Sequence, residues 1–226
     1  MKLKKNIDNV KLEIVKTAKK KERDPFKIKL VAITKNVPHH TVSEAINSGL
    51  TDIGESYIQE AAEKFPQIKN LKKATKHLVG HLQSNKAKKA VQLFDVIHSV
   101  DSKKLAHKLS HYCIEYNKII DIFIEVNLSK EETKFGIKEE ELKDLIEEIK
   151  NLKNLNLLGL MTIAPEIESE LTRPYFRRLK KLADKFNLKE LSMGMTSDYK
   201  IAIEEGSTYV RIGTAIFGKR EHEKIV

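Results

Sequence analysis

Cysteine and tryptophan are almost absent from this sequence, and each shortage excludes a class of protein. Cys113 is the single cysteine in 226 residues, so the chain can form neither an internal disulfide nor a cysteine-rich zinc site. Tryptophan is missing, and aromatic residues make up 6% of the chain. A protein so poor in aromatic rings lacks the usual platform on which nucleic-acid bases stack. We therefore expect no nucleic-acid partner.

Long apolar runs and flexible linkers are also missing. Residues 1–23 contain no continuous apolar stretch of the kind that forms the core of a signal peptide, and no later stretch approaches the ~20 apolar residues that span a bilayer. No segment rich in proline, glycine and serine divides the chain. We therefore expect a cytoplasmic protein without a membrane partner, folded as a single domain over residues 1–226.

Charge is abundant. Charged residues make up 33% of the chain, and the formal net charge of +10 favours an anionic partner such as a phosphorylated small molecule, a nucleic acid or a membrane surface. Much of the excess is lysine in helix-like segments, for example residues 71–76 and 86–89, beside an acidic run at 139–148. This mixture is typical of a solvated helix surface, so the net charge does not choose among these partners.

Short apolar runs alternate with longer amphipathic segments, as in repeated βα units around a parallel sheet. In segments such as 42–47, 102–116, 139–150 and 168–186, apolar residues recur every three or four positions, which predicts helices. The eight apolar runs are Ile28–Thr34, Asp52–Ser56, His77–Gly80, Val96–Val100, Ile120–Leu128, Leu157–Ala164, Glu190–Met195 and Thr208–Phe217. Eight units of this kind predict an α/β fold, a closed (β/α)8 TIM barrel.

An additional helix is predicted before the first strand. Leu3, Ile7, Val10, Ile14 and Ala18 recur at helical spacing and mark one apolar face. The expected architecture is a TIM barrel with an extra N-terminal helix.

Lys35 occupies a position where a barrel could use an amine. It follows the apolar run that ends at Thr34, which places it at the rim of the first predicted strand. A neutral amine at this point could attack an aldehyde. The alternative is a rim lysine paired with a carboxylate.

Arg211 lies within the eighth run, where strand alternation puts Tyr209, Arg211 and Gly213 on the same face. If that face points inward, the guanidinium needs a partner, because an unpaired buried charge is costly. The ring nitrogen of a pyridine cofactor and an acidic residue in the barrel core are the two candidates.

Small residues cluster where the last two strands are predicted to end. Ser192, Gly194 and Thr196 lie at the end of the seventh run, and Gly213 and Thr214 lie within the eighth. Loops after strands seven and eight of this fold often bind phosphate through backbone N–H groups and hydroxyls. The alternative is that these small residues only form turns.

The spacing of the histidines does not indicate a metal site. His77 and His81 have the spacing of one helical face, but His77 falls on a predicted strand. His107 and His111 share a helical face, yet no glutamate-containing zinc signature surrounds them. We predict no bound metal.

Several stretches together resemble the pyridoxal phosphate homeostasis proteins, whose barrel is similar to the N-terminal domain of alanine racemase. The order and spacing of these stretches carry the resemblance across nearly the whole chain. They are Val31–Lys35, Gly54–Glu60, His77–Lys86, Lys134–Gly136, Gly159–Thr162, Leu191–Met195 and Gly206–Gly218. Ser56 departs from the family pattern, which usually has asparagine after Gly-Glu, and Thr196 stands where serine is more usual.

The resemblance implies that the chain binds pyridoxal 5'-phosphate (PLP) as a Schiff base on Lys35, with Arg211 facing the pyridine nitrogen. It also implies that Ser192, Gly213 and Thr214 help to hold the phosphate, and Gly194 in the same loops is a further predicted cofactor-binding residue. A protein of this family is expected to buffer or deliver PLP in vitamin B6 and amino-acid balance. Its expected partners are PLP and PLP-dependent apoenzymes, and its expected state is a monomer or weak dimer.

Two features favour a carrier over an amino-acid enzyme. An arginine beside the ring nitrogen would keep that nitrogen unprotonated and weaken the ring as an electron sink. Alanine racemase also carries a second domain that supplies a catalytic tyrosine, and this sequence ends at Val226, just after the eighth unit. The alternatives are a weak racemase-like enzyme with Lys35 as its only base, and a basic RNA-binding protein.

Overall fold

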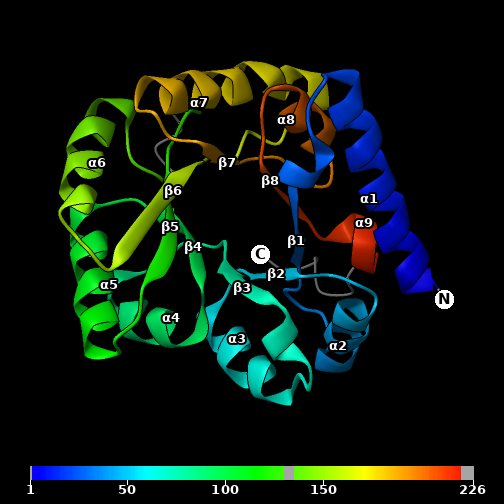
Figure 1. Cartoon of the computed structure of the whole chain (residues 1–226), viewed down its shortest axis with the longest axis horizontal. Coiled ribbons are helices and arrows are strands. Elements are labelled where there is room, and N and C mark those ends of the chain that lie inside the picture. The colour runs from blue at the N-terminus through cyan, green and yellow to red at the C-terminus, as the bar shows by residue number, and fades with distance from the viewer. Residues whose placement is uncertain (1, 130–134, 220–226) are drawn as a thin grey trace.

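Eight parallel strands form a closed barrel in the computed structural model, which describes residues 2–129 and 135–219. Strands that are consecutive in the sequence are neighbours in the barrel, and β1 closes it by pairing with β8. The strands are β1 (Lys29–Ile33), β2 (Asp52–Glu55), β3 (Thr75–Leu78), β4 (Val96–Val100), β5 (Ile120–Glu125), β6 (Leu155–Met161), β7 (Glu190–Ser192) and β8 (Tyr209–Ile212). Figure 1 shows this ring of strands inside a ring of helices, and the predicted TIM barrel is confirmed.

Helices join the strands on the outside of the barrel. They are α1 (Lys2–Lys20), α2 (His39–Asn47), α3 (Ile58–Lys64), α4 (Ala87–Leu93), α5 (Lys103–Glu115), α6 (Leu142–Lys150), α7 (Arg173–Lys185), α8 (Tyr199–Glu204) and α9 (Thr214–Phe217). The predicted helix at 102–116 begins at Lys103, because the Ser102 side chain caps it by accepting from the Leu105 N–H at 3.3 Å. Within the described ranges, none of the helices combines the length and the apolar character that a bilayer-spanning segment needs.

Two local predictions were wrong. Residues 71–76 form a short 3-10 turn at Leu71–Lys73 followed by the start of β3, and not one helix. The eighth apolar run predicts a strand that continues to Phe217, but β8 ends at Ile212 and Thr214–Phe217 forms α9. Gly213 leaves the extended conformation with φ −113° and ψ −74°, which starts this helix. A short apolar run does not distinguish a strand from a buried helix by its pattern alone.

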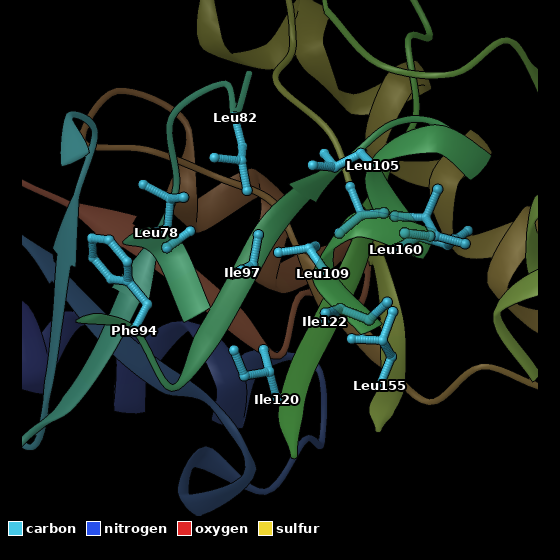
Figure 2. Close-up of a cluster of buried hydrophobic side chains, with 14 of the residues drawn as sticks. Leu78, Leu82, Phe94, Ile97, Leu105, Leu109, Ile120, Ile122, Leu155 and Leu160 are labelled. Atoms are coloured by element: carbon cyan, nitrogen blue, oxygen red, sulfur yellow. The ribbon is translucent and has the colours of Figure 1, made fainter. Parts of the chain in front are cut away.

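Strand alternation sends the side chains to two separate cores. The outward-facing side chains pack against the helices in a large cluster, and Figure 2 shows part of it, including Leu78 and Ile122 from strands and Leu109 from α5. The inward-facing side chains form a smaller cluster inside the barrel: Val31, Ile33, Val79, Val96, Phe123, Met161 and Tyr209.

The N-terminal helix covers the seam between β8 and β1. Ile7, Val10 and Ile14 of α1 are buried against Leu30 of β1 and Val210 of β8, and in Figure 1 α1 lies beside α8 and α9. These two helices are 6 and 4 residues long, so α1 supplies apolar surface that they are too short to provide. The predicted extra helix is confirmed.

Phe94, at the end of α4, tests the outer core. Its side chain is 0% exposed, whereas Phe26 is 95% exposed and serves as a matched control. We expect Phe94→Ala to lower the free energy of unfolding by about 3–5 kcal/mol, because the substitution removes apolar contacts and leaves a cavity. Phe26→Ala should change it by less than about 0.5 kcal/mol. Urea denaturation measures both, and equal changes in the two variants would contradict this assignment of the core.

Candidate functional site

The residues singled out in the sequence lie at one end of the barrel. Lys35 follows β1, Ser192 ends β7, Gly194 follows it, and Arg211 lies in β8 with Gly213 directly after that strand. In a closed parallel barrel the carboxyl ends of all strands meet at the same opening, and this is the end at which TIM barrels carry their sites. We call this opening the mouth.

Lys35 lies two residues beyond Ile33, which belongs to the inward-facing cluster. Lys35 is already in the turn that follows β1, at the rim of the barrel, and the residue is half-buried. Both of its neighbours are anchored. The Lys64 ammonium donates to the Thr34 carbonyl at 2.7 Å, and the Asn36 N–H donates to a Glu60 carboxylate oxygen at 2.6 Å.

An ionic cluster of the buried Glu55 and Lys64 with the partly exposed Glu60 makes these anchors possible. The Lys64 Nζ lies 2.8 Å from Glu55 Oε1 and 2.5 Å from Glu60 Oε1, and the Thr34 hydroxyl donates to Glu55 Oε1 at 2.6 Å. Burial raises the pKa of Glu55, although Lys64 and Thr34 oppose the shift. The other Glu55 oxygen, Oε2, is buried without a hydrogen-bond partner among the described residues. This cluster could not be predicted from the sequence, where Lys64 resembles the many other lysines of helical segments.

Arg211 is nearly buried, with 4% of the residue exposed, and its guanidinium lies against the ends of β6 and β7. Its Nη1 donates to the Ser192 hydroxyl at 2.6 Å, and its Nη2 donates to the Thr162 carbonyl at 2.9 Å. Among the residues that the structure describes, the Arg211 Nε–H makes no hydrogen bond. These two bonds use two of the five guanidinium N–H groups, so donors that include the Nε–H remain for a further acceptor.

Two carboxyl groups partly balance the positive charge of Arg211. Burial lowers the pKa of Arg211 to about 10, while Asp198 and Glu125 act in the opposite direction. Glu125, at the end of β5, is 5% exposed, and burial together with Asp101 raises its pKa to about 7, against the effect of Arg211. Arg211 stays cationic at neutral pH, whereas Glu125 titrates near it.

Ser192 lies inside the barrel beneath Arg211 and is fully buried. Besides accepting from Arg211, its hydroxyl lies 2.8 Å from Nδ1 of His98. The His98 Nε2 in turn lies 2.9 Å from Nδ1 of His77. The structure therefore brings Ser192 together with Arg211, but its hydroxyl already serves two interior partners. His98 was not singled out in the sequence, and His77 was considered only for metal binding.

The loop after β7 has a fixed shape that depends on Gly194. Its φ of +94° suits glycine, and a Cβ there would come within 2.5 Å of the Ala202 Cβ. The Gly194 carbonyl accepts from the Arg211 N–H at 2.9 Å, and Asp198 accepts from the Met195 N–H at 2.6 Å. These contacts hold Gly194 against the end of β8. Gly213 and the half-buried Thr214 follow β8 at the start of α9.

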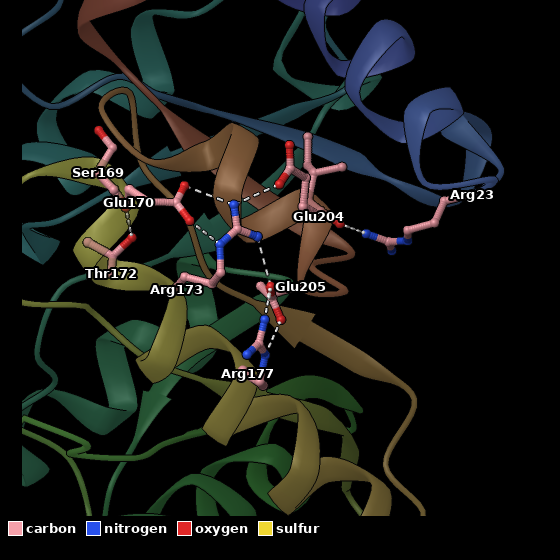
Figure 3. Close-up of polar contacts among 9 residues, drawn as sticks. Arg23, Ser169, Glu170, Thr172, Arg173, Arg177, Glu204 and Glu205 are labelled. Carbon is pink, nitrogen blue, oxygen red and sulfur yellow. Dashed lines mark hydrogen bonds and ion pairs between the residues drawn. The ribbon is translucent and has the colours of Figure 1, made fainter.

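An ionic network outside the barrel holds α8, the helix that follows this loop. In Figure 3 the Arg173 guanidinium lies between Glu170, Glu204 and Glu205, and Glu205 also contacts Arg177. The Arg173–Glu204 and Arg173–Glu205 distances are both 2.8 Å. The loop carrying Gly194 is thus fixed from the inside by β8 and from the outside by α7.

His77 and His81 do not meet. His77 is buried in the barrel, and its Nε2 lies 3.0 Å from Asp52 Oδ1. His81 is outside, stacked on Phe135 with ring centroids 3.7 Å apart. Ser56 is half-buried at the end of β2. Lys134, part of the segment Lys134–Gly136, lies outside the described residues.

Comparison with known sequences gives consistent matches over most of the chain. The family described as alanine racemase, N-terminal domain, matches residues 9–221. The pyridoxal phosphate homeostasis protein of Aquifex aeolicus is 43% identical over 201 residues, which cover 86% of this chain and 88% of that protein. The protein of the same name from Synechocystis is 41% identical over 203 residues, 87% of this chain and 93% of that protein.

Solved structures agree with these matches. PipY of Synechococcus elongatus with PLP bound is 34% identical, with a TM-score of 0.81, and the match covers 91% of this chain and 100% of that one. An alanine racemase of Clostridium difficile is 14% identical, with a TM-score of 0.73 over 98% of this chain and 57% of that one, which shows a common fold. The chain therefore belongs to the pyridoxal phosphate homeostasis protein family, whose barrel is of the alanine racemase N-terminal type.

Proposed function

We propose that this chain, as one domain over residues 1–226, binds PLP at the mouth of its barrel and buffers or delivers it inside the cell. Lys35 would hold the cofactor as a Schiff base, Arg211 would face the pyridine nitrogen, and Gly194, Gly213 and Thr214 would hold the phosphate. The observation that carries the proposal is the buried Arg211 cation, whose Nε–H has no acceptor among the described residues.

The residues at the mouth suit PLP in their chemistry. A pyridine nitrogen is a neutral acceptor, and the Arg211 Nε–H is a donor that needs one. An amine on an anchored loop suits the aldehyde, and hydroxyl and backbone N–H groups after strands seven and eight suit a phosphate. Ser192, predicted to help hold the phosphate, would also orient Arg211, because its hydroxyl accepts from Arg211 and lies 2.8 Å from His98 Nδ1.

The same arginine favours a carrier over an enzyme. Bound PLP supplies an electron-withdrawing ring, and it does so best when the ring nitrogen is protonated. Arg211 remains protonated and can only donate, so it would hold the nitrogen in its unprotonated form. PipY is a relative whose structure contains PLP, which supports the choice of cofactor. We further propose that PLP-dependent apoenzymes receive it and that the protein is a monomer or weak dimer.

The first test of this function is chemical trapping on Lys35. Reduction with borohydride in the presence of PLP should attach the cofactor permanently to Lys35, because that amine follows β1 at the rim of the mouth. Lys35→Ala should abolish both the visible absorption band and the adduct, whereas Lys103→Ala, at an exposed position of α5, should change neither. Peptide mass mapping identifies the modified residue, and an adduct on another lysine would refute the assignment.

The second test separates the phosphate from the ring. Thr214→Ala should weaken PLP binding roughly ten- to a hundredfold, since a lost hydrogen bond to a charged group costs about 1.5–3 kcal/mol. Thr214→Ser keeps the hydroxyl and is the matched control. Arg211→Ala should instead also change the visible spectrum, because it alters the ring environment. Fluorescence titration measures affinity, and equal affinity in Thr214→Ala and the unaltered chain would move the phosphate elsewhere.

The third test addresses the racemase-like alternative. In deuterated water the PLP-loaded protein should incorporate little deuterium at the α-carbon of common amino acids, because Arg211 makes the ring a weak electron sink. Proton NMR of the amino acids follows the exchange. Rapid exchange that Lys35→Ala abolishes and Lys103→Ala keeps would identify an enzyme and overturn the carrier proposal.

A further inference from the structure

A chain of hydrogen bonds runs through the barrel interior from Arg211 at the mouth toward the opposite end. Arg211 Nη1 lies 2.6 Å from the Ser192 hydroxyl, which lies 2.8 Å from His98 Nδ1. His98 Nε2 lies 2.9 Å from His77 Nδ1, and His77 Nε2 lies 3.0 Å from Asp52 Oδ1. We call these five residues the axial chain. Asp52 begins β2, at the end of the barrel away from the mouth.

When both histidine rings are neutral, the residues at the two ends of the axial chain set its direction. Arg211 can only donate, and an ionised Asp52 can only accept. Burial opposes ionisation of Asp52, but hydrogen bonds from His77 and Thr51 outweigh it and leave its pKa below the usual value. The Ser192 hydroxyl oxygen is an acceptor for Arg211, so its proton is free to point to His98 Nδ1. A neutral His98 then carries its proton on Nε2 and donates to His77 Nδ1, which leaves the His77 proton on Nε2, facing Asp52.

The surroundings of the histidine rings support this single arrangement. The His98 ring stacks on Phe123 with centroids 4.6 Å apart, and its edge meets Tyr209 at 5.9 Å. Burial lowers the pKa of His98 well below its usual value, and the nearby Arg211 and Lys29 act in the same direction, so the ring is neutral. Polar groups buried among such aromatic rings destabilise the fold unless each has a hydrogen-bond partner. The axial chain provides these partners.

We propose that Asp52, His77 and His98 are positioning residues that hold the Arg211 guanidinium in the orientation that meets the cofactor. The axial chain turns the Ser192 oxygen toward Nη1, and the Thr162 carbonyl holds Nη2. With both Nη groups held, the Nε–H is left for the ring nitrogen. This inference deepens the proposed function and rests on it, because Arg211 is taken to face PLP.

The direction of the axial chain can be measured without any cofactor. In the PLP-free protein with ¹⁵N-labelled histidine, long-range ¹H–¹⁵N NMR at neutral pH should show His77 and His98 both neutral and both protonated on Nε2. A proton on Nδ1 of either ring, or a cationic His77, would reverse or break the chain and overturn the assignment. This result does not depend on whether PLP binds.

The link to the cofactor is tested with substitutions that keep aromatic packing. His98→Phe should shift the visible band of bound PLP in the same direction as Arg211→Ala and weaken PLP binding roughly two- to thirtyfold. Tyr209 contacts the same two histidine rings but is not part of the axial chain. Tyr209→Phe should therefore leave the visible band of PLP unchanged. In the Arg211→Ala background His98→Phe should have no further effect, because it acts through Arg211. Additive effects, or an equal shift in Tyr209→Phe, would show a merely structural role.

Asp52 provides a second route to the same conclusion if His98→Phe does not fold. Asp52→Ala should shift the band in the same direction, and Asp52→Asn, which keeps an oxygen acceptor for His77, should restore it. If Asp52→Ala leaves the visible band unchanged, Asp52 does not help to position Arg211. Failure of the proposed function looks different: Lys35 would then trap no PLP in the unaltered chain, while the NMR result would still stand.

Discussion

Burial of the positive charge of Arg211 is the constraint on which the rest of the mouth depends. Removing an unpaired cation from water costs several kcal/mol, so the surrounding strands must provide acceptors and negative charge. The Ser192 hydroxyl and the Thr162 carbonyl provide the acceptors, and Asp198 and the ionised form of Glu125 provide negative charge. Each of these groups comes from a different strand or loop. The guanidinium of Arg211 in β8 is thereby hydrogen-bonded to the ends of β6 and β7, which fixes their relative positions.

Ion pairs hold the two sides of the mouth, and their environments differ. Glu55 and Lys64 are buried behind the loop of Lys35, whereas Arg173 meets Glu204 and Glu205 on the partly exposed outer side of α8. A buried pair adds little stability compared with apolar packing, but loss of one partner is costly because the other charge remains. Such pairs therefore serve mainly to specify where a loop lies. Here they fix the loop of the amine and the helix behind Gly194.

Strand alternation made much of the fold and part of the site predictable. It predicted the eight strands, the shared face of Tyr209 and Arg211 and the place of Lys35 at the rim, because each depends on the local pattern. It could not give the contact between His77 and His98, which needs the register between β3 and β4, nor the pairing of Lys64 with Glu55. The end of β8 was misplaced because Thr214–Phe217 is as apolar as a strand. Contacts between distant segments are fixed by packing, which a single sequence does not display.

The same alternation explains how the barrel tolerates a polar interior. Along β4 Ile97 faces the helices and His98 faces inward, and along β8 Val210 faces outward and Arg211 inward. The outward side chains belong to extensive apolar clusters that bury surface against the helices and provide most of the stabilisation. The inward positions can therefore hold polar side chains, provided that the buried polar groups have hydrogen-bond partners. The side chains that stabilise the fold and those available for ligand chemistry thus lie on opposite faces of the same strands. Residues next to each other in the sequence therefore have different roles.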